Sequence, residues 1–294
     1  MKMPNQDHSK ISPTAKLVAY FRQFSDIPFA ADVAALIHAE DVFNDLLQGA
    51  DLTPEFVNWA APLAEARYKS IVSAIKREGI TQVLELASGL SLRGLAMTED
   101  PGYTYVETDL PGIAEEKQQI ISIIKSNQAL RERHNLFFEA VNILSEPQIS
   151  SAIRHFSPSH PVAVVHEGLF QYLSMTEKET AARNIHSVLS RFGGVWITPD
   201  FETKAELERR SHTHSQQQKL AQAVTRATQR DLYNAAFDNQ EQIEDFFSRL
   251  GFQIRKSPQI DGSYQLSAMQ NLGIPEANIN NYKFNGNIWT LRVG

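Results

Sequence analysis

Two stretches of the chain decide its fold: residues 83–94, VLELASGLSLRG, and residues 105–117, YVETDLPGIAEEK. Each begins with an apolar run that contains or ends in acidic residues, Glu85 in the first and Asp109 in the second. Between the runs lie a turn of small residues at 87–89 and a predicted helix. A strand, a small-residue turn, a helix and a second strand with a terminal carboxylate typically hold a nucleoside cofactor.

The chemistry of this turn favours one kind of cofactor over another. Small residues let the backbone approach the ligand, and a carboxylate at the end of the second strand can accept both ribose hydroxyls. Asp109 is the best candidate for that carboxylate, although it could instead cap the following helix, and Glu107 stands close by. Ala87 and the absence of a third glycine depart from the usual dinucleotide signature. S-adenosylmethionine, which has no pyrophosphate, therefore fits better than NAD.

Apolar strands alternate with amphipathic helices from residue 81 onward. The predicted strands are residues 82–87, 103–108, 135–141, 161–166, 194–199, 252–257 and 287–293. Such alternation predicts an α/β fold, with a doubly wound, mostly parallel sheet covered by helices on both faces. We expect the last two strands to pair antiparallel. Ser174 and Glu177 form a capping box that predicts the start of the helix after the fourth strand.

The whole chain, residues 1–294, is predicted to form one domain with four parts. Residues 12–78 read as a helical N-terminal cap, because apolar residues recur at helical spacing. The other parts are the cofactor-binding core at 81–201, an inserted segment at 202–235 and the C-terminal part of the sheet at 239–294. The inserted segment is long, polar and helical, and its simplest interpretation from composition is an exposed helix.

Composition and charge restrict the class of protein. A chain of 294 residues that is 42% hydrophobic can bury a full core. Its net charge of −6 argues against a nucleic-acid-binding protein, which needs a basic face. No apolar run reaches membrane-spanning length, and MKMPNQDHSK has no hydrophobic signal-peptide core. The absence of cysteine excludes disulfides, thiolate zinc sites and thiol nucleophiles, and fits a cytoplasmic protein.

Four motifs in the same order along the chain resemble those of the leucine carboxyl methyltransferase family. LASGLSLRGL is similar to the family's Gly-Ala-Gly-Leu-Asp-Thr-Arg, and YVETDLPGIAEEK to its Glu-Val-Asp-(Leu/Phe)-Pro with a following Lys. HEGLFQYLSMTE, residues 166–177, resembles Glu-Gly-(Leu/Val)-x-x-Tyr-Leu. SPTAKLVAYFRQFSDIPFAADVA resembles Thr-Ala-x-x-x-Ala-x-x-Arg with its later Asp-x-x-Ala. The resemblance implies a seven-stranded, Rossmann-like S-adenosylmethionine-dependent methyltransferase in which residues 202–235 form a helical lid.

The resemblance also implies where the cofactor is held. Ala87 and Gly89 match the two motif glycines whose backbone faces the cofactor, and Asp109 matches the ribose acid. Arg67 resembles the arginine that pairs with the methionine carboxylate, and its bidentate geometry suits that role. Lys16 is a second cation for this carboxylate. As a lone arginine without the resemblance, Arg67 would be interpreted as a surface residue.

Further candidates follow the strand ends and the motifs. Glu85, on the first strand, is expected at the cofactor site. Asn142 and Ile143 are expected there too, because they stand where the family has Asp-Leu beside the adenine. The carbonyl oxygen of Asn142 can still accept from the adenine amino group. Ser91 stands where most members have Asp, and Arg93 matches the motif arginine, with the helix, a nearby acid or the ligand as its partner.

The fourth strand adds candidates on the substrate side. Glu167 lies at its end, where ligands bind in such sheets. Tyr172 is a candidate for the substrate side, although a packed aromatic is an alternative interpretation. His166 is more readily interpreted as a satisfied histidine than as a catalytic one. His212 and His214 would point to different faces of a helix, so no metal site is predicted.

The expected function is S-adenosylmethionine-dependent O-methylation of a carboxylate or hydroxyl, on a small molecule or on a protein C-terminal carboxylate. A carboxylate acceptor needs no general base, so positioning and exclusion of water would account for catalysis, and no catalytic residue is assigned. A small-molecule substrate is favoured over a protein terminus, while nucleic acid and membrane partners are not expected. A regulatory protein that binds S-adenosylmethionine without turnover is the alternative, and an NAD-linked dehydrogenase is disfavoured. The sequence does not determine the oligomeric state.

Overall fold

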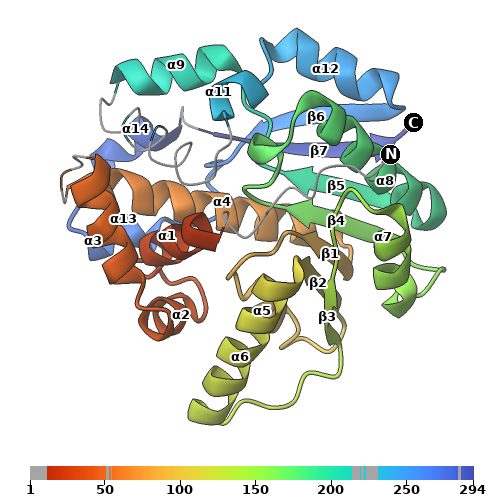
Figure 1. Ribbon diagram of the computed structural model, residues 1–294, viewed down its shortest axis with the longest axis horizontal. Coiled ribbons are helices and arrows are strands. Elements are labelled where there is room, and N and C mark those ends of the chain that lie inside the picture. The colour runs from red at the N-terminus through yellow and green to blue at the C-terminus, as the bar shows by residue number, and fades with distance from the viewer. Residues whose placement is uncertain are drawn as a thin grey trace.

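The computed structural model describes residues 12–50, 53, 55–213, 219, 222, 231–283 and 286–294. A seven-stranded sheet with the order β3-β2-β1-β4-β5-β7-β6 lies at its centre (Figure 1). Strands β1 to β5 run parallel, and β7 pairs antiparallel with both β5 and β6. The strands are β1 Gln82–Leu86, β2 Thr104–Asp109, β3 Leu136–Ala140, β4 Val162–His166, β5 Gly194–Thr198, β6 Phe252–Pro258 and β7 Asn287–Val293. The predicted doubly wound sheet and its antiparallel last pair are confirmed.

Helices precede, connect and follow the parallel strands. Those before the sheet are α1 Ser12–Arg22, α2 Ala30–Leu36, α3 Ala39–Ala50 and α4 Phe56–Glu78. The connecting helices are α5 Arg93–Met97, α6 Pro111–Asn127, α7 Glu146–Ala152 and α8 Met175–Phe192, with short 3₁₀ turns at Ile153–His155 and Phe170–Tyr172. After β5 come α9 Lys204–Thr213, α11 Leu232–Ala235, α12 Gln240–Arg249, α13 Ser267–Asn271, a 3₁₀ turn at Glu276–Ile279, and α14 Asn280–Lys283.

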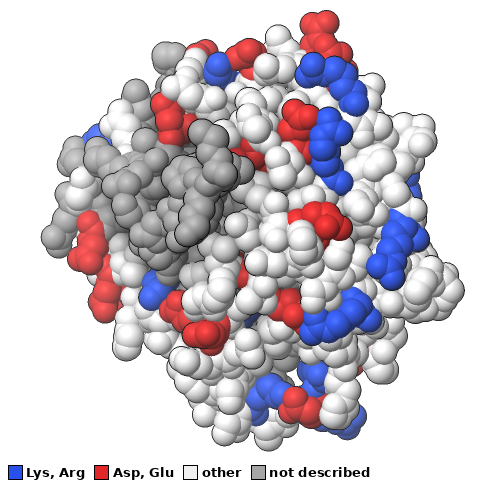
Figure 2. Space-filling model, turned by 45° about the vertical axis from the view of Figure 1, so that its right-hand side comes forward, with Lys and Arg blue, Asp and Glu red and all other residues white. Residues whose placement is uncertain are grey.

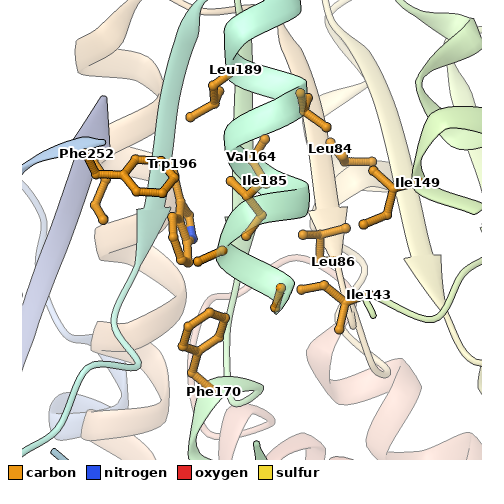
Figure 3. Packing of buried hydrophobic residues seen from close by; sticks show 14 of the residues in the cluster. Leu84, Leu86, Ile143, Ile149, Val164, Phe170, Ile185, Leu189, Trp196 and Phe252 are labelled. Atoms are coloured by element: carbon orange, nitrogen blue, oxygen red, sulfur yellow. The ribbon is translucent and has the colours of Figure 1, made fainter. Parts of the chain in front are cut away.

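The two faces of the sheet are packed by different helices because successive side chains of a strand point to opposite faces. On β1, Val83 belongs to the cluster that contains Ile71 and Ile75 of α4. Leu84 and Leu86 belong instead to the cluster that includes Ile185 and Leu189 of α8 (Figure 3). Each fully buried Leu or Ile contributes roughly 1.5–3 kcal/mol, so both helices are held firmly against the sheet.

The start of α8 shows how local sequence fixes an element. The Ser174 side chain accepts a hydrogen bond from the Glu177 backbone N–H, and the Glu177 side chain accepts one from the Ser174 backbone N–H. This is the predicted capping box, and it satisfies two backbone donors that a helix start otherwise leaves unpaired. The capping box thereby fixes the end of the segment that joins β4 to α8. Residues of this segment line the cavity described below.

Helices α1 to α3 lie together beside the end of the sheet toward which β4 and β5 point (Figure 1). Helix α1 contacts α2, α3 and α4. The predicted helical region 12–78 is divided into these four helices, and left-handed residues stand at two of the breaks, Phe29 with φ 64° and His38 with φ 50°. These breaks let α1 and α2 fold back over the carboxyl ends of the parallel strands.

The two ends of the inserted segment meet beside the sheet. Thr203 and Phe237 form a parallel bridge, and the Lys204 backbone N–H donates to the Phe237 carbonyl oxygen at 2.8 Å. Residues 214–218, 220, 221 and 223–230, the middle of the predicted lid, lie outside the described residues. None of the described helices combines the length and the apolar character of a membrane span.

Candidate functional site

A single large cavity of about 1120 Å³ lies at the carboxyl ends of β1, β2 and β4, and α1, α2, α9 and α11 also contribute to its walls. Protein pockets for one small molecule measure roughly 300–1,000 Å³, so this cavity lies just above the upper end of that range. Nearly all the predicted site residues line it: Arg67, Glu85, Ala87, Gly89, Asp109, Asn142, Ile143, Glu167 and Tyr172. The exception is Lys16, whose Nζ pairs with Glu116 at 3.2 Å.

The turn after β1 exposes backbone to the cavity. Ala87 has a φ of 49° and Gly89 a φ of 53°, so both adopt the left-handed conformation. The Ser88 backbone N–H donates to the Thr108 carbonyl oxygen at 2.9 Å, which ties the turn to β2. A left-handed conformation costs a non-glycine residue roughly 1–2 kcal/mol. Alanine at position 87 therefore introduces strain that the motif glycine of the family would not.

Asp109 closes this turn from the end of β2. One carboxylate oxygen accepts from the Gly89 backbone N–H and the other from the Leu110 backbone N–H, each at 2.7 Å. Burial raises the pKa of Asp109, and these two hydrogen bonds oppose the shift. Each carboxylate oxygen has a second lone pair, so the group can still accept from a ligand hydroxyl. Its predicted role in binding the ribose stays a prediction.

Glu107, the other acid near the end of β2, makes its contacts away from the cavity. It pairs with Lys117 at 2.6 Å and accepts from the Gly94 backbone N–H at 2.8 Å. Lys117 also donates to the Ser88 hydroxyl at 2.8 Å. Burial raises the pKa of Glu107, an effect that the Lys117 charge opposes. Glu107 does not line the cavity, so it braces the turn against α6.

A buried ion cluster forms one wall of the cavity. The Glu167 carboxylate accepts from Arg22 Nη2 at 2.6 Å and from Arg93 Nη2 at 2.9 Å, and Arg67 Nε lies 3.5 Å away. Burial alone would raise the pKa of Glu167, but the three arginine charges lower it below its ordinary value. Glu167 is therefore ionised at neutral pH, and it brings together side chains from α1, α4 and α5.

The deeper part of this cluster is centred on Arg93, whose side chain is fully buried. Arg93 pairs with Glu85, which also accepts from the Tyr105 hydroxyl at 2.7 Å. The Arg93 guanidinium lies 4.6 Å from the centre of the Tyr68 ring, and that of Arg22 lies 5.5 Å from it. Both contacts are within the range of cation–π attraction. Of the partners predicted for Arg93, which were the helix, a nearby acid and the ligand, the structure shows two acids, Glu85 and Glu167.

Asp200, just beyond β5, completes the cluster. It lies 2.6 Å from Arg67 Nη2 and 2.8 Å from His166 Nδ1, and its side chain is fully buried. It also accepts from the backbone N–H groups of residues 168–170. Burial would raise the pKa of Asp200, but the His166 hydrogen bond and the Arg67 charge hold it well below its ordinary value. Three arginines, Arg22, Arg67 and Arg93, thus balance Glu85, Glu167 and Asp200.

His166 and Tyr172 occupy different environments. His166 is fully buried, stacks on Phe170 with ring centres 4.8 Å apart, and does not line the cavity. Its Nδ1 pairs with Asp200, but Nε2 is buried without a hydrogen-bond partner among the described residues, so His166 is a core histidine of which only one ring nitrogen is satisfied. Tyr172 does line the cavity, and burial raises the pKa of its hydroxyl. Its predicted place on the substrate side stays a prediction.

The loop after β3 carries the residues predicted beside the adenine. The Asn142 side-chain oxygen accepts from the Leu144 backbone N–H at 3.0 Å, which leaves one lone pair for a ligand. Asn184 of α8 donates to the Ile143 carbonyl oxygen at 2.7 Å and fixes the loop. Asn142 and Ile143 therefore form a rigid wall of the cavity.

Two residues of the site were not identified from the sequence. Arg22 is buried, lines the cavity and reaches Glu167 from α1. Its position at the end of the Thr-Ala-x-x-x-Ala-x-x-Arg match was the available signal. Asp200 follows a parallel strand at its carboxyl end, where functional side chains collect in such sheets. That position could have identified Asp200 as a candidate from the sequence.

The described residues include no group of three or more His, Asp or Glu that would hold a metal. His214, one of the two histidines considered above, lies outside them. On the face shown in Figure 2, acidic and basic side chains are interspersed, and no continuous basic area is visible among the described residues. The cavity is therefore the main candidate for function in this part of the chain.

Comparison with known proteins shows what the chain is similar to. Residues 44–186 match the family model of leucine carboxyl methyltransferase. A Mycolicibacterium gilvum (strain PYR-GCK) protein named "Putative S-adenosyl-L-methionine-dependent methyltransferase" is 27% identical over 187 residues, covering 56% of this chain and 59% of that protein. A protein of the same name from Mycobacterium bovis (strain BCG / Pasteur 1173P2) is 28% identical over 182 residues, covering 59% of this chain and 54% of that protein. The matches thus span little more than half the length of these curated relatives.

Solved structures agree at the level of the fold. A DUF574 family protein from Streptomyces avermitilis MA-4680 has a TM-score of 0.57 and 13% identity, covering 96% of this chain and 97% of that one. A "putative methyltransferase" from Thermobifida fusca YX has a TM-score of 0.56 and 16% identity, covering 86% of this chain and 88% of that one. The family model matches residues 44–186, and the solved structures share the fold, so this part of the chain is similar to leucine carboxyl methyltransferases.

Proposed function

We propose that this protein is an S-adenosylmethionine-dependent methyltransferase that acts on oxygen. The observation that carries the proposal is one cavity that joins Asp109, at the end of β2, to the charged wall of Arg67 and Glu167. The names of the curated relatives support the same cofactor.

The residues present fit each part of this cofactor. Asp109 offers acceptor positions for ribose hydroxyls, and Asn142 offers one for the adenine amino group. The wall opposite presents both signs of charge, with Arg67 and Arg22 beside Glu167. A neutral cluster that exposes a guanidinium and a carboxylate suits the zwitterionic amino-acid end of the cofactor better than a pyrophosphate. NAD is disfavoured for this reason.

The chain's own contribution is positioning and exclusion of water. Bound S-adenosylmethionine would supply an already activated methyl group. Holding an acceptor in line with that group can contribute several kcal/mol by orientation alone. A carboxylate acceptor is deprotonated at neutral pH and needs no base, which agrees with the burial of His166 away from the cavity.

The acceptor is proposed to be a carboxylate or hydroxyl of a small molecule. Residues of α9 and α11, among them Leu207, Leu232 and Tyr233, line the cavity together with Tyr172. These helices belong to the segment at 202–235, and we propose that it covers the acceptor as a lid. A protein C-terminal carboxylate would need a more open entrance than a small acid or alcohol.

Direct binding tests the proposal. Isothermal titration calorimetry of the full chain should show binding of S-adenosylmethionine and S-adenosylhomocysteine, and none of NAD. A screen of small carboxylic acids and alcohols for formation of S-adenosylhomocysteine then tests turnover. Binding of the cofactor without turnover by any acceptor would favour a regulatory protein, and absence of cofactor binding would contradict the proposal.

A further inference from the structure

Asp200 contacts both Arg67 and the turn after β4 through one carboxylate. Oδ1 accepts from Arg67 Nη2 at 2.6 Å and from the Gly168 backbone N–H at 2.8 Å. Oδ2 accepts from His166 Nδ1 at 2.8 Å and from the Leu169 backbone N–H at 2.7 Å. The Phe170 backbone N–H adds a longer contact of 3.2 Å to Oδ2.

Three of these partners belong to the wall of the main cavity, whereas Asp200 itself does not. Arg67, Gly168 and Leu169 line the main cavity, but the Asp200 side chain is fully buried behind them. The contacts of Arg67 with Asp200 and Glu167 involve Nη2 and Nε of its guanidinium, and neither uses Nη1. Contacts at two different nitrogens fix the orientation of the guanidinium plane.

The turn that Asp200 holds directs several backbone donors to one place. Gly168 has a φ of 73°, in the left-handed region, and three successive N–H groups of residues 168–170 point at one carboxylate. Without an anion there, these buried donors would lose their acceptor, which costs about 1–3 kcal/mol for each group left unpaired.

We infer that Asp200 is a positioning residue that fixes Arg67 and the 168–170 turn relative to each other, and so sets the affinity for the amino-acid end of the cofactor. This inference rests on the proposed function. Asp200 touches no ligand in this arrangement, and its effect passes through Arg67. A change at Asp200 should therefore alter the binding of ligands with the amino-acid carboxylate more than the binding of ligands without it.

The test compares two probes on the full chain, S-adenosylhomocysteine and methylthioadenosine, which lacks the amino-acid group. For Asp200→Asn we expect S-adenosylhomocysteine to bind at least about tenfold more weakly, the effect of losing one charge-assisted contact, with methylthioadenosine changed much less. The double variant combines Asp200→Asn with Arg67→Ala. Its loss of affinity for S-adenosylhomocysteine should be no larger than that of Arg67→Ala alone, because both changes act through one guanidinium. Equal weakening of both probes, or losses that add, would overturn the inference.

Glu65→Gln is the matched control. Glu65 is also fully buried, pairs with Lys69 at 2.6 Å and accepts from the backbone N–H groups of Ser267 and Ala268, but it does not line the cavity. This variant should lower stability and leave the ratio of the two affinities unchanged. A change in the ratio with Glu65→Gln would mean that loss of any buried carboxylate produces the effect, and would overturn the inference.

A ligand-free measurement keeps the inference separate from the proposed function. Hydrogen exchange of the backbone amides of residues 168–170 should be faster in Asp200→Asn than in the wild type, and unchanged in Glu65→Gln. If Asp200→Asn does not fold, Asp200→Glu, which keeps the charge and displaces it, should show the same selective loss. A wild-type protein that binds neither probe contradicts the proposed function, whereas wild-type binding with an unselective loss in both variants contradicts this inference alone.

Discussion

The carboxylate of Asp109 accepts a hydrogen bond of 2.7 Å from the backbone N–H of Gly89, which joins the carboxyl ends of β1 and β2. The two residues are neighbours in space because β1 and β2 pair in parallel, with Glu85 opposite Glu107. The proposed ribose acid thus also supports the turn over which the cofactor would lie. If Asp109 binds the ribose as proposed, binding and local structure depend on the same carboxylate.

Asp109→Ala should weaken S-adenosylhomocysteine binding by about 1.5–3 kcal/mol, through loss of charge-assisted hydrogen bonds. Calorimetry measures the affinity, and Asp109→Asn, which keeps one acceptor oxygen, should lose less. Asp100→Asn is the control, because Asp100 also accepts from a backbone N–H, that of Gly102 at 2.8 Å, in an exposed turn. Unchanged affinity in Asp109→Ala would remove Asp109 from the binding site.

Arg67→Ala should weaken S-adenosylhomocysteine much more than adenosine or methylthioadenosine, which lack the carboxylate. A difference of roughly 2 kcal/mol is expected for loss of one partner of a charged pair. Arg67→Lys should recover only part of it, since an ammonium cannot make a two-pronged contact. The comparison of ligands by calorimetry is needed because Arg67→Ala also leaves Asp200 without its guanidinium.

The control for this substitution lies on the same helix. Arg77 is half exposed and pairs with Asp261 at 3.5 Å, so Arg77→Ala should leave all three affinities unchanged. Equal weakening of all three ligands by Arg67→Ala would show that Arg67 supports α4, and Arg22 would then be the next candidate for the carboxylate.

Ala87→Gly should increase the free energy of unfolding by up to about 1 kcal/mol. It relieves a left-handed alanine at φ 49°, which costs roughly 1–2 kcal/mol, while the greater freedom of glycine in the unfolded chain offsets part of the gain. Ala129→Gly is the matched control for Ala87→Gly, because Ala129 also has a φ of 49° but is exposed. Urea denaturation should show a gain in both variants, and only Ala87→Gly should change cofactor affinity. A loss of stability in both would contradict the argument from strain.

Lys178 should make stability depend on pH. Its Nζ is buried and donates to the carbonyl oxygens of Leu173 and Ala235, and burial lowers its pKa from 10.5 to about 8. Between these two values the unfolded chain holds more protons, so the contribution of this group to stability rises with pH, by up to about 1.4 kcal/mol per pH unit. Below about pH 8 its contribution is constant.

Lys178→Met isolates this effect from other titrations. The difference in unfolding free energy between the variant and the wild type, measured by urea denaturation from pH 7 to 10, should shift in favour of the wild type as the pH rises above about 8. Two curves that remain parallel over this range would show that the Lys178 pKa is not lowered in the folded protein.

The sequence by itself determined the sheet and the position of the site along it. The strand predicted at 252–257 is observed at Phe252–Pro258, and that predicted at 82–87 at Gln82–Leu86. Periodicity, small-residue turns and capping boxes are local properties, since each depends on residues a few positions apart. The carboxyl ends of parallel strands share one edge of the sheet, so strand-end candidates such as Asp109 and Glu167 were expected to meet in one cavity.

Only the tertiary structure decided which charges pair. Arg22 and Glu167 are 145 positions apart, and Arg67 and Asp200 are 133 apart, yet each pair is joined at 2.6 Å. Whether a lone arginine is exposed or buried depends on how α1 and α4 fold over the sheet, and no local pattern contains that information. Burial excludes water, so these charges require partners, and the packing of distant elements determines which partners they find.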